Sequence, residues 1–198
     1  MHESVLIEIA NHVIPSDFIG KSIVEFGSRN VNGGLRRFIE RFHPASYLGL
    51  DYIYGEGVDR CFDLEKDDLP CQFDVVISTE TIEHVQNWRR FLNLVKSSCK
   101  PGGLLILTGR GPGMPYHGYP FDFWRFDSVM ISKAFWDCNI LHLIDDWQVP
   151  GFILIAKRTD LREMDYSDVV PLPAPSPPNI ITRWRSRFIG VMNVMVGI

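Results

Sequence analysis

The chain has 198 residues, of which 45% are hydrophobic and 22% are charged, and its formal net charge is −4. This length favours one globular domain, and the apolar content excludes the composition of a disordered chain. A net negative charge disfavours a surface built to hold a nucleic-acid backbone, so no nucleic-acid partner is expected. The sequence contains no run of 18 or more apolar residues, which excludes an ordinary transmembrane helix.

The four cysteines are scattered at positions 61, 71, 99 and 138, without a C-x-x-C pair or a histidine at metal-ligand spacing. The sequence therefore predicts neither a metal site nor a disulfide framework. Free, reduced cysteines indicate a cytoplasmic protein. Residues 1–18 carry Glu3 and Glu8 within an apolar stretch, so they predict an amphipathic helix and not a signal peptide.

Short apolar runs alternate with helical patterns between residues 22 and 157, which is typical of βαβ units around a parallel sheet. A helix over 34–42 follows from apolar residues at one-face spacing. Further helices are predicted over 88–99 and 127–137, the second capped by Asp127. A glycine- and proline-rich loop follows at 109–120. Seven strands are expected, at 22–26, 46–51, 58–62, 73–78, 104–108, 140–147 and 152–156.

The C-terminal part has a different composition. Residues 172–179 read LPAPSPPN, which predicts an extended proline-rich linker. Residues 180–198 combine three arginines with an apolar end and carry no acids. They predict a contact with an anionic membrane surface or with another subunit, and a disordered tail is the alternative. The expected organisation is a domain over 1–160, a linker over 161–179 and a basic, apolar tail over 180–198.

Four motifs follow one another along the chain. They are Val24-Glu-Phe-Gly-Ser-Arg-Asn-Val-Asn-Gly-Gly34, Gly49-Leu-Asp51, the stretch from Phe73 to Val85, and Lys100-Pro-Gly-Gly103. Together they resemble the class I S-adenosylmethionine (SAM) dependent methyltransferases, in particular the small type 11 branch, over residues 20–157. The resemblance implies an α/β, Rossmann-like, doubly wound fold: a mostly parallel seven-stranded sheet with helices on both faces and the last strand antiparallel. It also implies SAM as the cofactor and S-adenosylhomocysteine (SAH) as its product.

The expected cofactor residues follow the first strands. Gly27 lets the backbone turn sharply, so that a ligand carboxylate can meet main-chain N–H groups. Asp51 ends the second strand, where an acidic residue accepts hydrogen bonds from ribose hydroxyls in dinucleotide folds. By resemblance, Glu25 holds the amino-acid end of the cofactor and Asp63 receives the adenine amino group. The whole expected set is Glu25, Gly27, Ser28, Asp51 and Asp63, with Leu64 beside the adenine ring and Thr79 and Glu80 bordering the methyl group.

Methyl transfer from a sulfonium is an in-line displacement, so a base is needed only when the acceptor arrives protonated. His84 and His117 are the candidate bases, because the side-chain pKa of histidine is nearest to neutrality. A structural histidine is the alternative for each of them.

An H-x-Y-P-x-D-x-W-R-F stretch like residues 117–126 borders the acceptor pocket in type 11 relatives. The residues expected to bind the acceptor are Tyr116, Tyr119, Trp124 and Arg125. The alternative is a rigid packed cover in which Asp122 pairs with Arg125.

The sequence therefore predicts a SAM-dependent methyltransferase that acts on an oxygen or nitrogen of a small-molecule acceptor, glycans and lipid-linked intermediates included. Little chain remains for a separate substrate-recognition domain. A SAM-binding but non-catalytic partner protein, recruited through its C-terminal tail, is the alternative. A nicotinamide enzyme is disfavoured, because Gly27, Gly33 and Gly34 lack the G-x-G-x-x-G spacing that a pyrophosphate needs.

Overall fold

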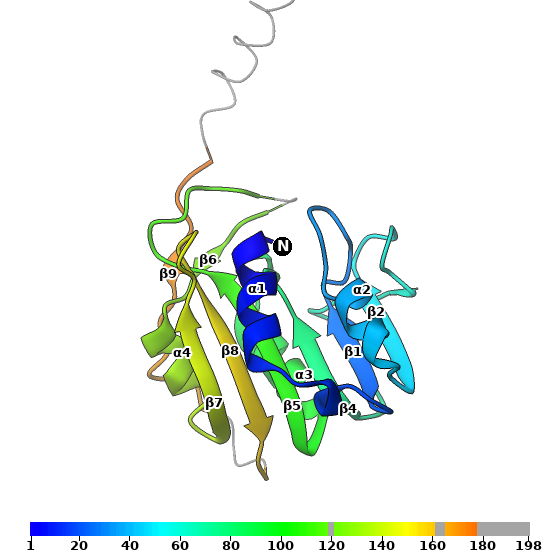
Figure 1. The fold of residues 1–198 in the computed structure, drawn as a ribbon. Coiled ribbons are helices and arrows are strands. Elements are labelled where there is room, and N and C mark those ends of the chain that lie inside the picture. The colour runs from blue at the N-terminus through cyan, green and yellow to red at the C-terminus, as the bar shows by residue number, and fades with distance from the viewer. Residues whose placement is uncertain (119–120, 161–164, 178–198) are drawn as a thin grey trace, which may run out of the picture.

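The structure, a computed structural model, describes residues 1–118, 121–160 and 165–177. A seven-stranded sheet in the order β3-β2-β1-β4-β5-β8-β7 forms its centre (Figure 1). Strand β8 runs antiparallel to both of its neighbours, and the other strands are parallel to one another. The predicted fold is confirmed. The strands are β1 (Ser22–Phe26), β2 (Ser46–Asp51), β3 (Arg60–Cys61), β4 (Phe73–Ser78), β5 (Cys99–Arg110), β7 (Cys138–Asp145) and β8 (Gly151–Arg158).

The order of the strands reverses between β1 and β4. Strand β1 pairs with β2 on one side and with β4 on the other, and Phe26 lies opposite both Leu50 and Ser78. The segments that follow these three strands therefore begin side by side at one edge of the sheet. In open α/β sheets such a switch point is where ligands bind, outside the carboxyl ends of the strands.

Helices cover both faces of the sheet, which explains why the central strands are almost continuously apolar. On one face, α1 and α2 pack against Ile23, Val75 and Ile106. On the other face, α3 and α4 pack against Val24, Val76 and Leu105. The helices are α1 (Glu3–His12), α2 (Arg36–Ile39), α3 (Trp88–Ser97) and α4 (Ser128–Ala134), with 3-10 turns η1 (Pro15–Asp17), η2 (Glu40–Phe42) and η3 (Ile82–His84).

The two helices of the second face begin at capping residues. The Asn87 side chain accepts a hydrogen bond from the Arg90 backbone N–H, and the Asp127 side chain accepts one from Met130. Each cap satisfies a backbone donor that has no partner within its helix and contributes about 1 kcal/mol. The predicted start of α4 after Asp127 is confirmed, but the helix ends at Ala134, before the predicted end at Asp137.

The segment expected as a linker packs onto the domain where it is described, at residues 165–177. Tyr166 and Val169 are buried, and the Tyr166 ring lies 5.7 Å from the Trp88 ring. Strand β9 (Leu172–Pro173) then pairs antiparallel with β6 (Trp124–Arg125). The proline-rich segment is thus extended, as expected, but it forms a small sheet with the domain and is not a free spacer. The tail over 180–198 lies outside the described residues.

Within the described residues, no helix combines the length and the apolar character needed to cross a membrane. The four cysteines carry free thiols. Cys99 is buried, and this burial raises the pKa of its thiol to about 12, so it is a packing residue of the core and not a reactive thiol.

Candidate active site

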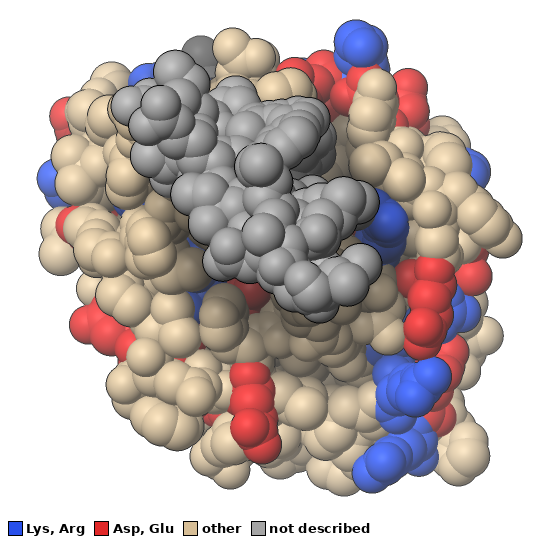
Figure 2. All heavy atoms as spheres, turned by 90° about the horizontal axis from the view of Figure 1, so that it is seen from above, with Lys and Arg blue, Asp and Glu red and all other residues tan. Residues whose placement is uncertain are grey.

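A cavity of about 480 Å³ lies across the carboxyl ends of β1, β2 and β4, at the point where the strand order reverses. This volume suits a small-molecule or cofactor site. In Figure 2, which views this face from above, the visible described surface is mostly uncharged, and both Lys or Arg and Asp or Glu side chains lie around its edge. All eight expected cofactor residues line the cavity, and so do both candidate bases: Glu25, Gly27, Ser28, Asp51, Asp63, Leu64, Thr79, Glu80, His84 and His117.

The turn after β1 requires glycine at position 27. Gly27 has a φ of +74°, and a Cβ atom there would overlap the side chain of Thr81. Its backbone N–H donates to the Leu50 carbonyl oxygen at 2.8 Å, which ties the turn to the end of β2. Ser28 comes next, and its buried hydroxyl has no hydrogen-bond partner among the described residues. The turn therefore holds a buried polar atom without a partner in the wall of the cavity.

Glu25 is buried at the floor of the cavity. Its carboxylate Oε2 accepts a hydrogen bond of 2.7 Å from the Tyr47 hydroxyl. Burial raises the pKa of Glu25 to about 7, although the Tyr47 hydrogen bond and the charge of Arg36 oppose this shift. Glu25 is thus a carboxyl group that a cationic ligand would readily ionise near neutral pH.

Asp51 and Asp63 are held in place by their own loops. Asp51 accepts hydrogen bonds from the backbone N–H groups of Ile53, at 2.9 Å, and Arg29, at 3.2 Å. Asp63 accepts from the Glu65 backbone N–H and from the Lys66 ammonium, and the Lys66 contact lowers the pKa of Asp63. Both carboxylates are therefore fixed in orientation at the cavity wall.

Glu80 has partners that the sequence did not indicate. The fully buried guanidinium of Arg110 donates to its Oε1 at 2.7 Å, and the His2 backbone N–H donates to the same atom at 2.9 Å. Burial raises the pKa of Glu80, but the Arg110 charge and the His2 hydrogen bonds outweigh it and leave that pKa lowered. Glu80 has a φ of +49°, in the left-handed region. Its hydrogen bond from His2 ties the residue just before α1 to the cavity wall. Arg110 also bonds Asp146, at 3.0 Å.

The two candidate bases lie against each other. The rings of His84 and His117 are 5.0 Å apart in an edge-to-face arrangement. His84 Nδ1 lies 2.6 Å from the Phe121 carbonyl oxygen, and His117 Nδ1 lies 3.1 Å from Asp122. Burial lowers the pKa of His117, but contacts with Glu83 and Asp122 outweigh it and leave that pKa raised. The structure brings His84 and His117 together in the wall of the cavity.

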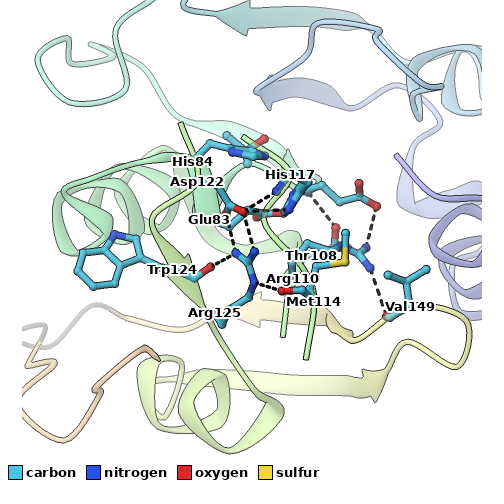
Figure 3. A network of polar contacts seen from close by, with 12 residues as sticks. Glu83, His84, Thr108, Arg110, Met114, His117, Asp122, Trp124, Arg125 and Val149 are labelled. Atoms are coloured by element: carbon cyan, nitrogen blue, oxygen red, sulfur yellow. Dashed lines mark hydrogen bonds and ion pairs between the residues drawn. The ribbon is translucent and has the colours of Figure 1, made fainter. Parts of the chain in front are cut away.

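Of the residues expected to bind the acceptor, Trp124 and Arg125 make their hydrogen bonds within the protein. Arg125 is buried and forms a two-pronged ion pair with Asp122, at 2.5 and 2.6 Å. The Trp124 indole N–H donates to the carbonyl oxygens of Val85 and Gln86, and its ring points away from the histidines (Figure 3).

The described lining of the cavity includes neither Trp124 nor Arg125, and it does not include Tyr116. The hydrogen bonds of Trp124 and Arg125 favour the packed cover that was the alternative for this stretch, and their role in acceptor binding stays a prediction. Phe121 and Phe123 are the residues of this stretch, besides His117, that line the cavity. Tyr119 lies outside the described residues.

An open, doubly wound α/β sheet with a cavity at its switch point is the architecture of the Rossmann-like proteins, whose ligands bind at that position. A family model described as a methyltransferase domain matches residues 6–132. The chain therefore belongs to the class I SAM-dependent methyltransferase family, whose cofactor is SAM.

The relatives cover most of the chain at low identity. Phthiotriol/phenolphthiotriol dimycocerosates methyltransferase 1 of Mycobacterium ulcerans is 25% identical over 187 residues, 82% of this chain and 67% of the relative. A SAM-dependent methyltransferase from Mesorhizobium loti matches with a TM-score of 0.56 at 16% identity, over 78% of this chain and 98% of its own.

A third relative is known with ligands. The Burkholderia thailandensis 1,6-didemethyltoxoflavin-N1-methyltransferase, with bound 1,6-didemethyltoxoflavin and SAH, matches with a TM-score of 0.54 at 11% identity, over 79% of this chain and 77% of its own. At these identities the two solved structures show a shared fold.

Proposed function

We propose that this chain transfers the methyl group of SAM to an oxygen or nitrogen atom of a small-molecule acceptor. One observation carries the proposal: a single cavity is lined by the carboxylates expected to hold the cofactor and, at its other end, by the histidine pair. SAM supplies an electrophilic methyl group when it is bound. The residues of this chain have to bind, orient and shield the two reactants.

The cofactor contacts follow from the positions of the side chains. The buried Glu25 carboxylate faces the ammonium of the cofactor, and the Gly27–Ser28 turn, whose two backbone N–H groups donate to the Leu50 carbonyl oxygen, lines the cavity beside it. Asp51 receives the ribose hydroxyls. Asp63 receives the adenine amino group, with Leu64 packed beside the ring. The fit is supported by the unpartnered Ser28 hydroxyl and by the glycine turn that no larger residue can adopt.

The acceptor end lies beyond Thr79 and Glu80, where the cavity reaches His84 and His117. Either histidine can take a proton from an acceptor hydroxyl or amine. Phe121 and Phe123 stand beside them with their rings 5.8 Å apart, and Phe121 is 61% exposed. This aromatic rim favours an acceptor with an apolar body, so lipid-linked and aromatic acceptors are the classes to test first, and glycans second.

The experiment that tests this proposal measures SAH formation from SAM with a panel of such acceptors, using the full chain. Turnover with at least one acceptor, lost in His117→Gln and His84→Gln but with SAH binding kept, supports it. The alternative of a non-catalytic SAM-binding partner predicts tight SAH binding and no turnover with any acceptor. Absence of SAH binding would contradict both.

A further inference from the structure

Three possible metal ligands converge at the acceptor end of the cavity. Glu83 and His84 belong to η3, and His117 comes from the loop that follows β5 (Figure 3). A potential ligand atom of each lies within 4.8 Å of those of the other two. The cluster contains none of the cysteines, which is why the spacing of the cysteines did not reveal it.

Glu83 has two carboxylate oxygens that accept no hydrogen bond within the described chain. Its side chain is fully buried, and both of its carboxylate oxygens have no hydrogen-bond partner among the described residues. His117 Nε2 is 3.7 Å from Glu83 Oε1, and this nitrogen is also buried and without a hydrogen bond. Burying a carboxylate without a partner is costly, so such groups are usually paired or coordinate a metal.

The other ring nitrogens of both histidines are already engaged. The Phe121 carbonyl oxygen can only accept, so His84 Nδ1 carries the proton of that 2.6 Å hydrogen bond. His117 Nδ1 faces the Asp122 carboxylate, which Arg125 holds from behind through two bonds. In this tautomer each Nε2 keeps a free lone pair. A histidine oriented by a carboxylate or a carbonyl oxygen through its second nitrogen is the usual arrangement around protein-bound metals.

We propose that Glu83, His84 and His117 bind a divalent transition-metal cation. Two imidazoles and one carboxylate suit Zn²⁺ or Fe²⁺, whereas Mg²⁺ and Ca²⁺ prefer oxygen ligands. Ligand atoms at about 2.1 Å from a tetrahedral Zn²⁺ lie about 3.4 Å apart, so separations of up to 4.8 Å have to shorten by up to about 1.4 Å. Such a movement needs only small side-chain rotations.

This inference rests on the proposed function and makes it more specific. Because His84 and His117 line the cavity, a cation held by them keeps a coordination position open toward the acceptor. An acceptor hydroxyl bound there loses its proton to solvent more readily, since a bound cation lowers the pKa of a coordinated oxygen. The acceptor atom is then oxygen, and the histidines act as ligands in place of bases.

The test titrates tag-free, chelator-treated full chain with ZnCl₂ in a calorimeter and with CoCl₂ in an absorption spectrometer. The expected result is one Zn²⁺ bound per chain and a Co²⁺ spectrum typical of nitrogen and oxygen ligands. Glu83→Gln and His117→Gln are each expected to lose about 100-fold in affinity, as a lost ligand should cost at least as much as a lost second-shell partner. His43→Asn is the matched control, because His43 is exposed and precedes β2 at the opposite edge of the sheet.

SAH binding, measured on the same samples, shows whether each variant is folded and keeps the two proposals apart. If the wild type binds SAH but binds no Zn²⁺ or Co²⁺, or if the variants bind them as the wild type does, the metal site is refuted and the proposed function stands. If the wild type fails to bind SAH, the proposed function fails whatever the metal result.

Discussion

The Tyr47 hydroxyl donates a hydrogen bond of 2.7 Å to the buried carboxylate of Glu25, two residues before the glycine turn of the cavity. Burial raises the pKa of Glu25 to about 7, and the Tyr47 bond keeps it from rising further. The ammonium of a bound cofactor favours the ionised form of Glu25. Cofactor binding and the ionisation of this carboxyl group therefore depend on each other.

Binding of SAH should therefore weaken as the pH falls from about 8 to about 6, by roughly tenfold, because the ionised fraction of a group with a pKa near 7 falls by that factor. Calorimetric titration across this range measures the effect. In Glu25→Gln the affinity should be lower and nearly independent of pH. In Tyr47→Phe the midpoint should move to higher pH. A wild-type affinity that does not change with pH would rule out the contact between Glu25 and the ammonium.

The raised pKa of Glu25 also predicts how the free energy of unfolding depends on pH when no ligand is bound. Its pKa is raised in the folded chain above the ordinary value of 4.5. Between these two values the folded state holds the proton more tightly than the unfolded state, so the free energy of unfolding should fall as the pH rises through this window and then level off. Urea unfolding at several pH values measures this slope. Glu25→Gln should flatten it, and an unchanged slope in that variant would assign the effect to other groups.

Asp51 gives a direct test of the cofactor assignment. Asp51→Ala should weaken SAH binding by about 10- to 100-fold, since hydrogen bonds to a charged group contribute about 1.5–3 kcal/mol. The matched control is Asp68→Ala, whose side chain is 80% exposed and pairs with Arg90 away from the predicted ribose site. Calorimetry measures both, with thermal unfolding to check the fold. Equal affinities in the two variants would remove Asp51 from the cofactor site.

The sheet and the residues at its carboxyl edge could be predicted from the sequence because their signals are local. The run 73–78 is apolar except at Asp74 and Ser78, Gly27 directly follows a strand, and Asp51 ends one. The linker was predicted from its prolines, but the burial of Tyr166 and Val169 depends on partners far along the chain. Those two apolar side chains were the available signal that the segment packs on the domain.

The polar contacts of the site were beyond sequence patterns, because they join distant segments. Arg110 meets Glu80 and Asp146, each at least 30 positions away. Arg110 falls in the glycine- and proline-rich stretch expected as a loop, so the sequence does not mark it as a buried residue at the end of β5. Glu83 gives no local signal for a similar reason, because its proximity to His117 exists only where the loop after β5 folds back over η3.

The turn at Gly27 should tolerate no side chain. Gly27→Ala places a Cβ atom against Thr81 at a φ of +74°, so overpacking and backbone strain together should lower the free energy of unfolding by about 2–4 kcal/mol. Adding Thr81→Ala should recover only part of this loss, because the strained φ remains. Gly34→Ala is the control, since nothing lies within 4 Å of a Cβ there. Urea unfolding of the variants measures each value, and a fully stable Gly27→Ala would contradict the turn geometry.

A substitution at Arg125 can distinguish whether residues 117–126 form a packed cover or a wall that binds the acceptor. The Arg125 guanidinium bonds Asp122 twice and also donates to the carbonyl oxygens of Met114, Pro115 and Trp124. A lysine keeps the charge but cannot make this planar set of bonds, so Arg125→Lys should lower the free energy of unfolding by about 1–3 kcal/mol. Exposed Arg89, which only stacks on Trp88, gives the control Arg89→Lys, with a change near zero. If Arg125→Lys kept full stability while the KM for an acceptor rose, Arg125 would contact the acceptor itself and the cover would have to open during binding.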